Sequence, residues 1–138
     1  MILYPERFQQ AEPAGFDGVF DWDFLLPAFY KTKIQPMDID AVVERRGKIL
    51  LFETKEPGKD IPLGQKITLE RFILIGKGDI CLFLVYGKTE REINCMQEWH
   101  YLRGRINKLN KISCDAAYVL KRVTDWFNWA NQYNGCRE

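Results

Sequence analysis

The chain has 138 residues, which fits one domain, and 46% of them are hydrophobic with 14% aromatic, enough to bury a core without disulfides or a structural metal. Charged residues make up 28%, an ordinary fraction that argues against intrinsic disorder. The formal net charge of +1 excludes a protein that binds nucleic acid through its overall charge, so such a partner would be held by a local patch.

The cysteines and the single histidine limit the kinds of site that the chain can build. No two of the four cysteines are spaced as a CxxC pair, and Cys81 lies in an apolar run where we expect it to be buried. His100 is the only histidine, which excludes any site that needs two. With no signal peptide and no apolar run of about 18 residues, the sequence predicts a soluble, cytoplasmic protein with reduced thiols.

Residues 38–55 have the pattern of a β-hairpin. They follow a loop-rich segment, residues 1–28, in which one short helix is expected near Asp21–Leu26. Apolar and polar residues alternate in the first strand of the hairpin, and Arg45-Arg46-Gly47 supplies a turn. The second strand, Lys48–Lys55, is mostly apolar until its end, as expected for an interior strand of a covered sheet.

The remaining elements alternate between helix and strand. An apolar stripe at helical spacing predicts a helix over about Gln65–Ile75, and a continuous apolar run predicts a buried central strand over Ile80–Tyr86. A strand is expected around Ile93–Tyr101, followed by a polar loop over 103–112. Ser113 is the expected N-cap of a C-terminal helix. The apolar face of that helix is expected to comprise Ala116, Val119, Leu120, Val123, Trp126, Phe127 and Ala130. This order predicts an α/β fold in which helices flank a mixed sheet.

Charged residues at the open end of the hairpin are the most informative feature of the sequence. Asp38 and Asp40 share one face of the first strand, and Glu53 and Lys55 share one face of the second. Folding at the turn would place Asp40 near Glu53, where two carboxylates repel each other unless a cation lies between them. Because oxygen ligands without Cys or His select hard ions, the pattern indicates a Mg²⁺ or Mn²⁺ site suited to phosphodiester hydrolysis, or else a cross-strand salt-bridge cluster.

Asp40 and the tripeptide Glu53-Thr54-Lys55 resemble the PD-(D/E)XK motif of a nuclease superfamily that includes Holliday-junction resolvases and many restriction endonucleases. The tripeptide matches the ExK part of the motif. Pro36-Met37-Asp38 is similar to the PD element as well, so Asp38 competes with Asp40 as the primary metal ligand. The resemblance covers about residues 36–86.

The resemblance implies a restriction-endonuclease-like αβββαβ core within a single domain over residues 1–138, with residues 21–35 as the place for its first helix and strand. It also implies a Mg²⁺- or Mn²⁺-dependent deoxyribonuclease, in which Asp40 and Glu53 bind the metal and Lys55 positions the attacking water. Several members carry a glutamine that points into the site from the following helix, and Gln65 matches it. By analogy, the small size suggests a phage-type DNA-processing enzyme.

Basic residues outside the motif are candidates for contacts with DNA. We expect these contacts from Lys59 and Lys66 near the metal and from the basic stretch formed by Arg103, Arg105, Lys108 and Lys111. The alternative for this stretch is an ordinary solvated surface. His100 and the tryptophans Trp99, Trp126 and Trp129 are expected to be structural. Other possibilities left open are RNA as substrate, a homodimer, and a catalytically silent protein that binds nucleic acid or a protein partner.

Overall fold

The computed structural model describes residues 20–132, and the chain divides into two compact units, Met1–Asp38 and Ile39–Glu138. In the first unit a 3-10 helix, η1 (Asp23–Phe29), confirms the short helix expected near Asp21–Leu26 and extends beyond it. The described residues of this unit form no strand, so they do not supply the first strand of the expected core. That the whole chain is one domain stays a prediction.

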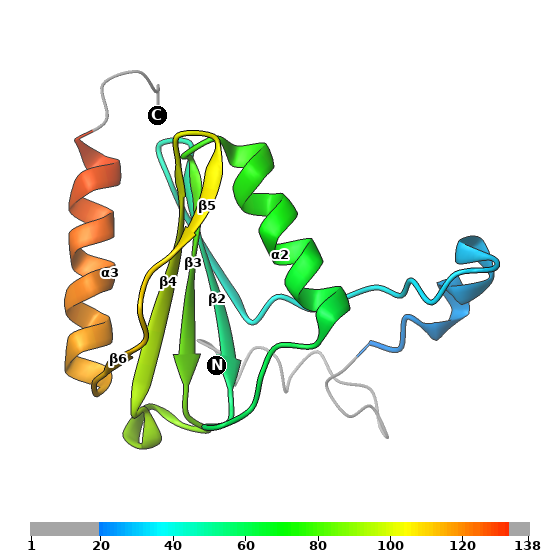
Figure 1. Ribbon diagram of the computed structural model, residues 1–138, viewed down its shortest axis with the longest axis horizontal. Helices are drawn as coiled ribbons and strands as arrows, with labels where there is room; N and C mark the ends of the chain where they lie inside the picture. The colour runs from blue at the N-terminus through cyan, green and yellow to red at the C-terminus, as the bar shows by residue number, and fades with distance from the viewer. Residues whose placement is uncertain (1–19, 133–138) are drawn as a thin grey trace, which may run out of the picture. The chain divides into compact units, whose positions relative to one another are not determined.

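A mixed sheet forms the centre of the second unit (Figure 1). Its strands are β1 (Ala41–Arg45), β2 (Lys48–Lys55), β3 (Ile80–Tyr86), β4 (Cys95–Leu102), β5 (Arg105–Lys108) and β6 (Ile112–Ser113). They lie in the order β1-β2-β3-β4-β5, and β6 also pairs with β4. Among the described strands, only β2 and β3 pair in parallel, and they are joined by a crossover through helix α2 (Leu63–Gly76). The predicted α/β fold with a mixed sheet is therefore confirmed.

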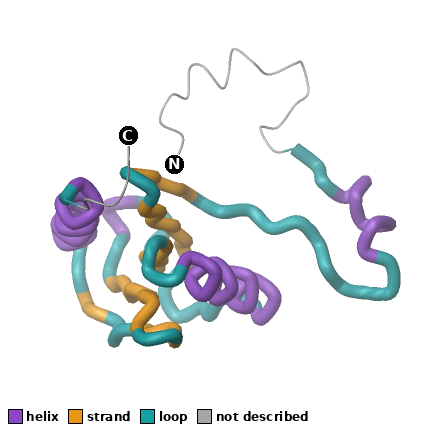
Figure 2. The backbone as a smooth tube through the Cα atoms, turned by 90° about the horizontal axis from the view of Figure 1, so that it is seen from above, coloured by secondary structure: helices purple, strands orange, loops and turns teal. Residues whose placement is uncertain are grey.

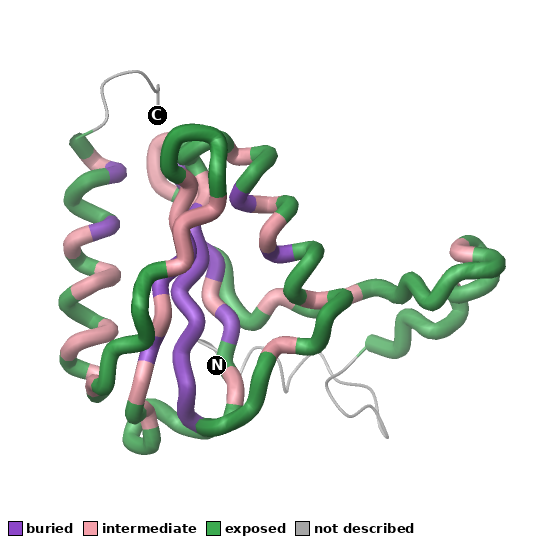
Figure 3. The backbone as a smooth tube through the Cα atoms, viewed as in Figure 1, coloured by how far each residue is buried: buried purple, intermediate pink, exposed green. Residues whose placement is uncertain are grey.

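Two helices cover opposite faces of this sheet, α2 on one side and α3 (Ala116–Asn131) on the other (Figure 2). Because side chains alternate along a strand, each central strand supplies apolar residues to both layers. Burial is concentrated on the inner strands (Figure 3). The core beneath α3 contains Leu50, Cys81, Phe83, Met96, Trp126 and Ala130, which confirms the predicted burial of Cys81. Helix α2 buries Leu69 and Ile73 against the other face.

The turn between β1 and β2 fixes the register of the hairpin. Arg46 and Gly47 both have positive φ, 53° and 85°, as the two central residues of a type I′ turn do. The register that the turn sets, continued one residue beyond Ala41, puts Asp40 opposite Glu53. The predicted hairpin and its turn are confirmed.

Two predictions for the C-terminal third were wrong. Residues 103–112 are not a polar loop, because Arg103-Gly104 forms a second tight turn with positive φ and folds β5 back onto β4. Ser113 is not the cap of α3, since it pairs within the sheet as part of β6. Asp115 is the N-cap instead, and its Oδ1 accepts a hydrogen bond of 3.1 Å from the Tyr118 backbone N–H.

The apolar face of α3 is narrower than its sequence predicted. Trp126 and Ala130 are buried as expected, whereas Leu120 is 68% exposed and Phe127 is 42% exposed. Both exposed residues lie on the flank of the stripe that packs against the sheet, so the expected face was too wide. Among residues 20–132, no helix is long and apolar enough to cross a membrane.

Alanine substitutions at Gly87, directly after β3, and at Gly64, in α2, are expected to change the stability in opposite directions. A Cβ added at Gly87 would lie 2.8 Å from the backbone Cα of Ile93, which cannot give way as a side chain can, whereas one added at Gly64 meets no atom within 4 Å. We expect Gly87→Ala to lower the free energy of unfolding by about 2 kcal/mol. Gly64→Ala, within α2, should raise it by about 0.5–1 kcal/mol. Urea denaturation of the two variants tests this, and equal stabilities would contradict it.

Candidate active site

The residues of the predicted site meet at one end of the sheet, on the face covered by α2. Glu53 and Lys55 lie at the C-terminal end of β2, Asp40 immediately precedes β1, and Gln65 lies in the first turn of α2. β2 and β3 run in parallel, so this end is where the carboxyl ends of both strands meet (Figure 1). In α/β sheets such an edge is the usual place for a ligand site.

Glu53 is the buried centre of this group. Its residue is only 3% exposed, although it is a carboxylate. Oε1 accepts a hydrogen bond of 2.7 Å from Gln65 Nε2 and lies 3.7 Å from Lys55 Nζ. Oε2 is also buried and has no hydrogen-bond partner among residues 20–132. A buried carboxylate oxygen without a partner is costly for the fold, and a bound cation would offset that cost.

Asp40 is held in place by Thr54, the middle residue of the ExK tripeptide. Its Oδ2 accepts two hydrogen bonds, one of 2.7 Å from the Thr54 backbone N–H and one of 2.9 Å from the Thr54 hydroxyl. Both donors use the same carboxylate oxygen, which leaves Oδ1 outside this pair of bonds. The sequence predicted the role of Asp40 but not that of Thr54, whose hydroxyl holds the Asp40 carboxylate. The one sign of this role in the sequence is a hydroxyl residue directly after Glu53.

Burial and neighbouring charge raise the pKa of Glu53 above its ordinary value. Desolvation is the larger cause and the Asp40 carboxylate is the second, while the Gln65 hydrogen bond, the Lys55 ammonium and a backbone hydrogen bond at Asp40 oppose the shift. The single nearby cation therefore does not compensate for the burial of Glu53 and its proximity to Asp40. An added divalent cation would favour the ionised carboxylate and reverse this shift.

The donor set fits a hard divalent cation. Within the described part of the chain, no cluster of three or more His, Cys, Asp or Glu side chains is placed to hold a metal. Mg²⁺ commonly takes only one or two protein carboxylates and keeps water or substrate oxygens in its other positions. Asp40 and Glu53, with one buried oxygen lacking a partner, match that requirement. Asp38 ends the first unit, so the choice between Asp38 and Asp40 as the primary ligand stays a prediction.

The candidate DNA-binding residues are divided between the two ends of the sheet. Arg103 lies in the turn between β4 and β5 and Arg105 follows it, at the end opposite Glu53 (Figure 1). Lys108 is engaged with α2, since its Nζ lies 2.8 Å from Glu70 Oε2. The basic stretch is therefore not one patch beside the site.

Three other lysines of the predicted set lie at or near the site end. Lys111 Nζ lies 4.6 Å from the centre of the Tyr86 ring, and Tyr86 is paired in register with Lys55. A hydrogen bond to Tyr86 raises the pKa of Lys111. Lys59 follows the end of β2 and is exposed, with its Nζ 3.5 Å from Glu56, and Lys66 is exposed next to Gln65.

A second polar cluster, which sequence reasoning missed, lies on the opposite face of the sheet. Glu98 is 5% exposed and pairs with Arg122 of α3, at 2.6 Å from Oε2 to Nε, and with His100, at 2.7 Å from Oε1 to Nε2. Burial alone would raise the pKa of Glu98, but the hydrogen bonds from His100 and Arg122 and the Arg122 charge lower it to about 2. The sequence did contain a sign of this cluster, since Glu98 shares the inward face of the strand with Met96 and His100.

Comparisons with known proteins give no relative of this chain: no family model, no curated protein and no solved structure matches it.

Proposed function

We propose that this protein is a Mg²⁺- or Mn²⁺-dependent nuclease that hydrolyses DNA phosphodiester bonds, with Asp40 and Glu53 as the metal ligands. The observation that carries the proposal is the buried carboxylate of Glu53, which has one oxygen without a partner and lies opposite Asp40 in the hairpin register. The PD-(D/E)XK resemblance of the same residues supports it, and with it a restriction-endonuclease-like core.

Each residue of the group has a task in this proposal. A divalent cation, when bound, supplies the positive charge that offsets charge developing on the phosphate during hydrolysis. Lys55, with its ammonium 3.7 Å from Glu53, is placed to donate hydrogen bonds to the attacking water and to a phosphate oxygen. Gln65 holds one oxygen of Glu53 and so orients the other. Thr54 does the same for Asp40.

The decisive experiment measures cleavage of single-stranded, duplex, flapped and four-way-junction DNA with Mg²⁺, Mn²⁺ or EDTA. We expect wild-type cleavage with either metal and none with EDTA. Lys55→Ala should lower the rate by about 10²- to 10⁴-fold, the usual contribution of a positioned proton-transfer group.

Lys121→Ala serves as the matched control, because the Lys121 side chain is 68% exposed on α3, across the sheet from Glu53, and pairs with Asp125. It should change the rate little. Cleavage that resists EDTA, or that Lys55→Ala leaves intact, would refute the proposal. The same panel with RNA substrates decides between DNA and RNA.

Thr54→Val should weaken the metal site without removing a ligand. The substitution keeps the backbone N–H that binds Asp40 and removes only the hydroxyl, so we expect an affinity for Mg²⁺ about five-fold lower. The rise in melting temperature with Mg²⁺ concentration measures this affinity. Thr68→Val is the control, since the Thr68 hydroxyl donates to the Gly64 carbonyl on the exposed side of α2. Equal affinities in the two variants would show that the Thr54 hydroxyl does not position Asp40.

A further inference from the structure

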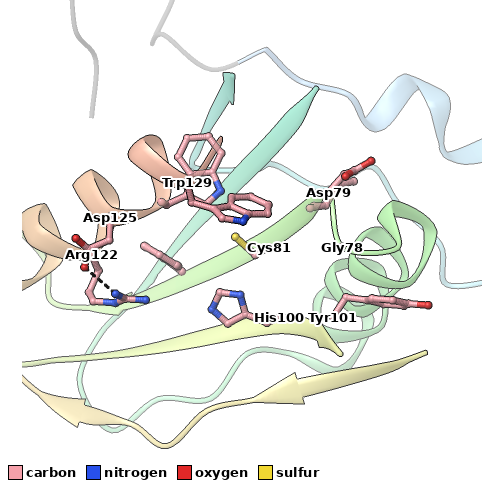
Figure 4. A pocket seen from close by; sticks show the side chains of 11 residues that line it. Gly78, Asp79, Cys81, His100, Tyr101, Arg122, Asp125 and Trp129 are labelled. Carbon is pink, nitrogen blue, oxygen red and sulfur yellow. Dashed lines mark hydrogen bonds and ion pairs between the residues drawn. The ribbon is translucent and has the colours of Figure 1, made fainter. Parts of the chain in front are cut away.

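The charged side chains around the cavity of about 320 Å³ beneath α3 are all paired. The pairs are Arg122 with Asp125, drawn in Figure 4, Arg122 and His100 with Glu98, and Asp79 with Lys48. Desolvation is the main cause that raises the pKa of Cys81 in its wall to about 12, so this group stays a thiol and is a poor nucleophile. Within residues 20–132 this cavity therefore leaves no unpaired charge for a ligand.

A smaller pocket, of about 200 Å³, lies at the end of the sheet that holds Glu53 and Lys55. We call it the Tyr86 pocket, and its lining consists of Pro57, Gly58, Tyr86, Asn94, Cys95 and Lys111. Tyr86 pairs in register with Lys55, so both side chains lie on the face that α2 covers. Gly87, directly after Tyr86, donates a hydrogen bond of 2.9 Å to the Lys55 carbonyl. Because neighbouring strands lie about 4.8 Å apart, the Tyr86 pocket begins one strand away from Lys55.

Lys111 brings to this pocket a positive charge that no ion pair neutralises. Its Nζ lies 4.6 Å from the centre of the Tyr86 ring, and it forms no ion pair within the described part of the chain. Lys59 and Lys88 differ, since both pair with Glu56, at 3.5 and 3.6 Å. A hydrogen bond to Tyr86 raises the pKa of Lys111, so its ammonium is charged at neutral pH. The pocket is therefore suited to an anion.

The rest of the lining is suited to a group of the size of one phosphate. Asn94 is exposed, and its backbone is fixed by hydrogen bonds of 3.1 Å to Tyr86 and Cys114, so its carboxamide is available as a second donor. At Gly58 the wall is open, because a Cβ added there would meet no atom within 4 Å. The volume of about 200 Å³ is below that of most small-molecule sites, about 300–1,000 Å³, and is too small for a whole nucleotide.

We propose that the Tyr86 pocket binds one phosphate group of the DNA strand, beside the scissile one, through the Lys111 ammonium and the Asn94 carboxamide. The inference rests on the proposed function, since its ligand is the strand that would be cut at Asp40 and Glu53. Lysine binds a phosphate as a point charge, and the carboxamide adds a directed hydrogen bond. Two sources share this chemistry: an internal phosphodiester, or a terminal phosphate. The first fits an enzyme that cuts within a strand, and the second fits one that cuts from an end.

The test is fluorescence anisotropy of the full chain in EDTA with three single-stranded oligodeoxynucleotides, at a series of salt concentrations. They share one sequence and an internal label, and carry a 5′ phosphate, a 3′ phosphate or neither. Lys111→Met should bind about five- to ten-fold more weakly and lower the slope of log affinity against log salt by about 0.7, the value for one phosphate contact. Asn94→Ala should bind about two- to three-fold more weakly with the slope unchanged, because the carboxamide is neutral. Lys121→Met is the control, since it removes the same charge from an exposed side chain of α3.

The outcomes separate the two sources of the phosphate. A loss of affinity in Lys111→Met with all three oligonucleotides supports an internal phosphate, and a loss confined to one phosphorylated end supports a terminal one. Equal binding by Lys111→Met and Lys121→Met, no binding by the wild type, or an unchanged affinity in Asn94→Ala overturns the proposal. Because the measurement contains no metal, it is independent of cleavage. Cleavage without any effect of Lys111→Met on binding would refute the Tyr86 pocket alone, whereas the effect on binding without cleavage would refute the nuclease alone.

Discussion

Glu53→Gln is expected to abolish metal-dependent cleavage and, at the same time, to raise the free energy of unfolding of the metal-free protein by about 1 kcal/mol or more. Glutamine keeps the size of the side chain and can still accept from Gln65, but it removes a buried charge that lies beside Asp40. A residue retained only for stability would behave in the opposite way. Urea denaturation with EDTA and with Mg²⁺, together with the cleavage assay, measures both effects.

The increase in the free energy of unfolding caused by Glu53→Gln is expected to depend on pH. The folded pKa of Glu53 is raised, so its favourable contribution is complete below the ordinary value near 4.5 and is lost as the pH rises through the folded pKa. The stability advantage of Glu53→Gln should therefore grow upward from pH 4.5 and then level off. Added Mg²⁺ should remove it by stabilising only the wild type.

Glu56→Gln is the control for Glu53→Gln, because Glu56 is exposed and forms surface ion pairs with Lys59 and Lys88, at 3.5 and 3.6 Å. It should change stability by less than about 0.5 kcal/mol. A loss of stability in Glu53→Gln, with a normal response to Mg²⁺, would mean that Glu53 serves the fold and binds no metal.

Arg122→Met is expected to lower the free energy of unfolding by about 3 kcal/mol at pH 7, because it leaves the buried Glu98 carboxylate without its main partner. Glu98→Gln in the same chain should recover much of the loss by removing the stranded charge. In the wild type the lowered pKa of Glu98 stabilises the fold above about pH 4.5, and this contribution is lost as the pH falls toward 2. Thermal denaturation of the single and double variants between pH 3 and pH 7 measures these terms.

Lys121→Met is the appropriate comparison for Arg122→Met. Lys121 neighbours Arg122 and pairs with Asp125 at 2.9 Å, but its side chain is 68% exposed. Its loss should cost less than about 1 kcal/mol. If Arg122→Met is as mild as Lys121→Met, solvent reaches Glu98 more than its burial indicates.

The hairpin and the elements around it were predictable because their signals are local. The pairing of the two strands is set by three local features: the alternation of apolar and polar residues before Arg46, the glycine in the turn, and the apolar strand that ends at Lys55. This pairing alone puts Asp40 opposite Glu53. Helix α2 was predicted from the helical spacing of its apolar residues, two of which, Leu69 and Ile73, are buried.

The rest depended on contacts that the sequence does not show. β5 reads as a polar segment because it lies at the edge of the sheet, where side chains need not be apolar, and its Arg103-Gly104 turn was as informative as Arg46-Gly47 but was overlooked. A run of basic residues says nothing about which end of a sheet each residue reaches. The hydrogen bonds of Thr54 with Asp40, and the pairing of Glu98 with Arg122, depend on side-chain conformations that only the folded chain selects.

The length of the turn at Arg46-Gly47 determines which residues of the two strands face each other in the site. The two carboxylates are thirteen positions apart in the sequence, and they meet only because two residues, and no other number, lie between the paired strands. One residue inserted there and absorbed by β1 would slide that strand by one position and turn the Asp40 side chain to the opposite face of the sheet, toward α3. Every residue of the site would still be present in the sequence, yet the site would be lost. In this chain the spacing between the site residues is therefore as much a part of the site as the residues themselves.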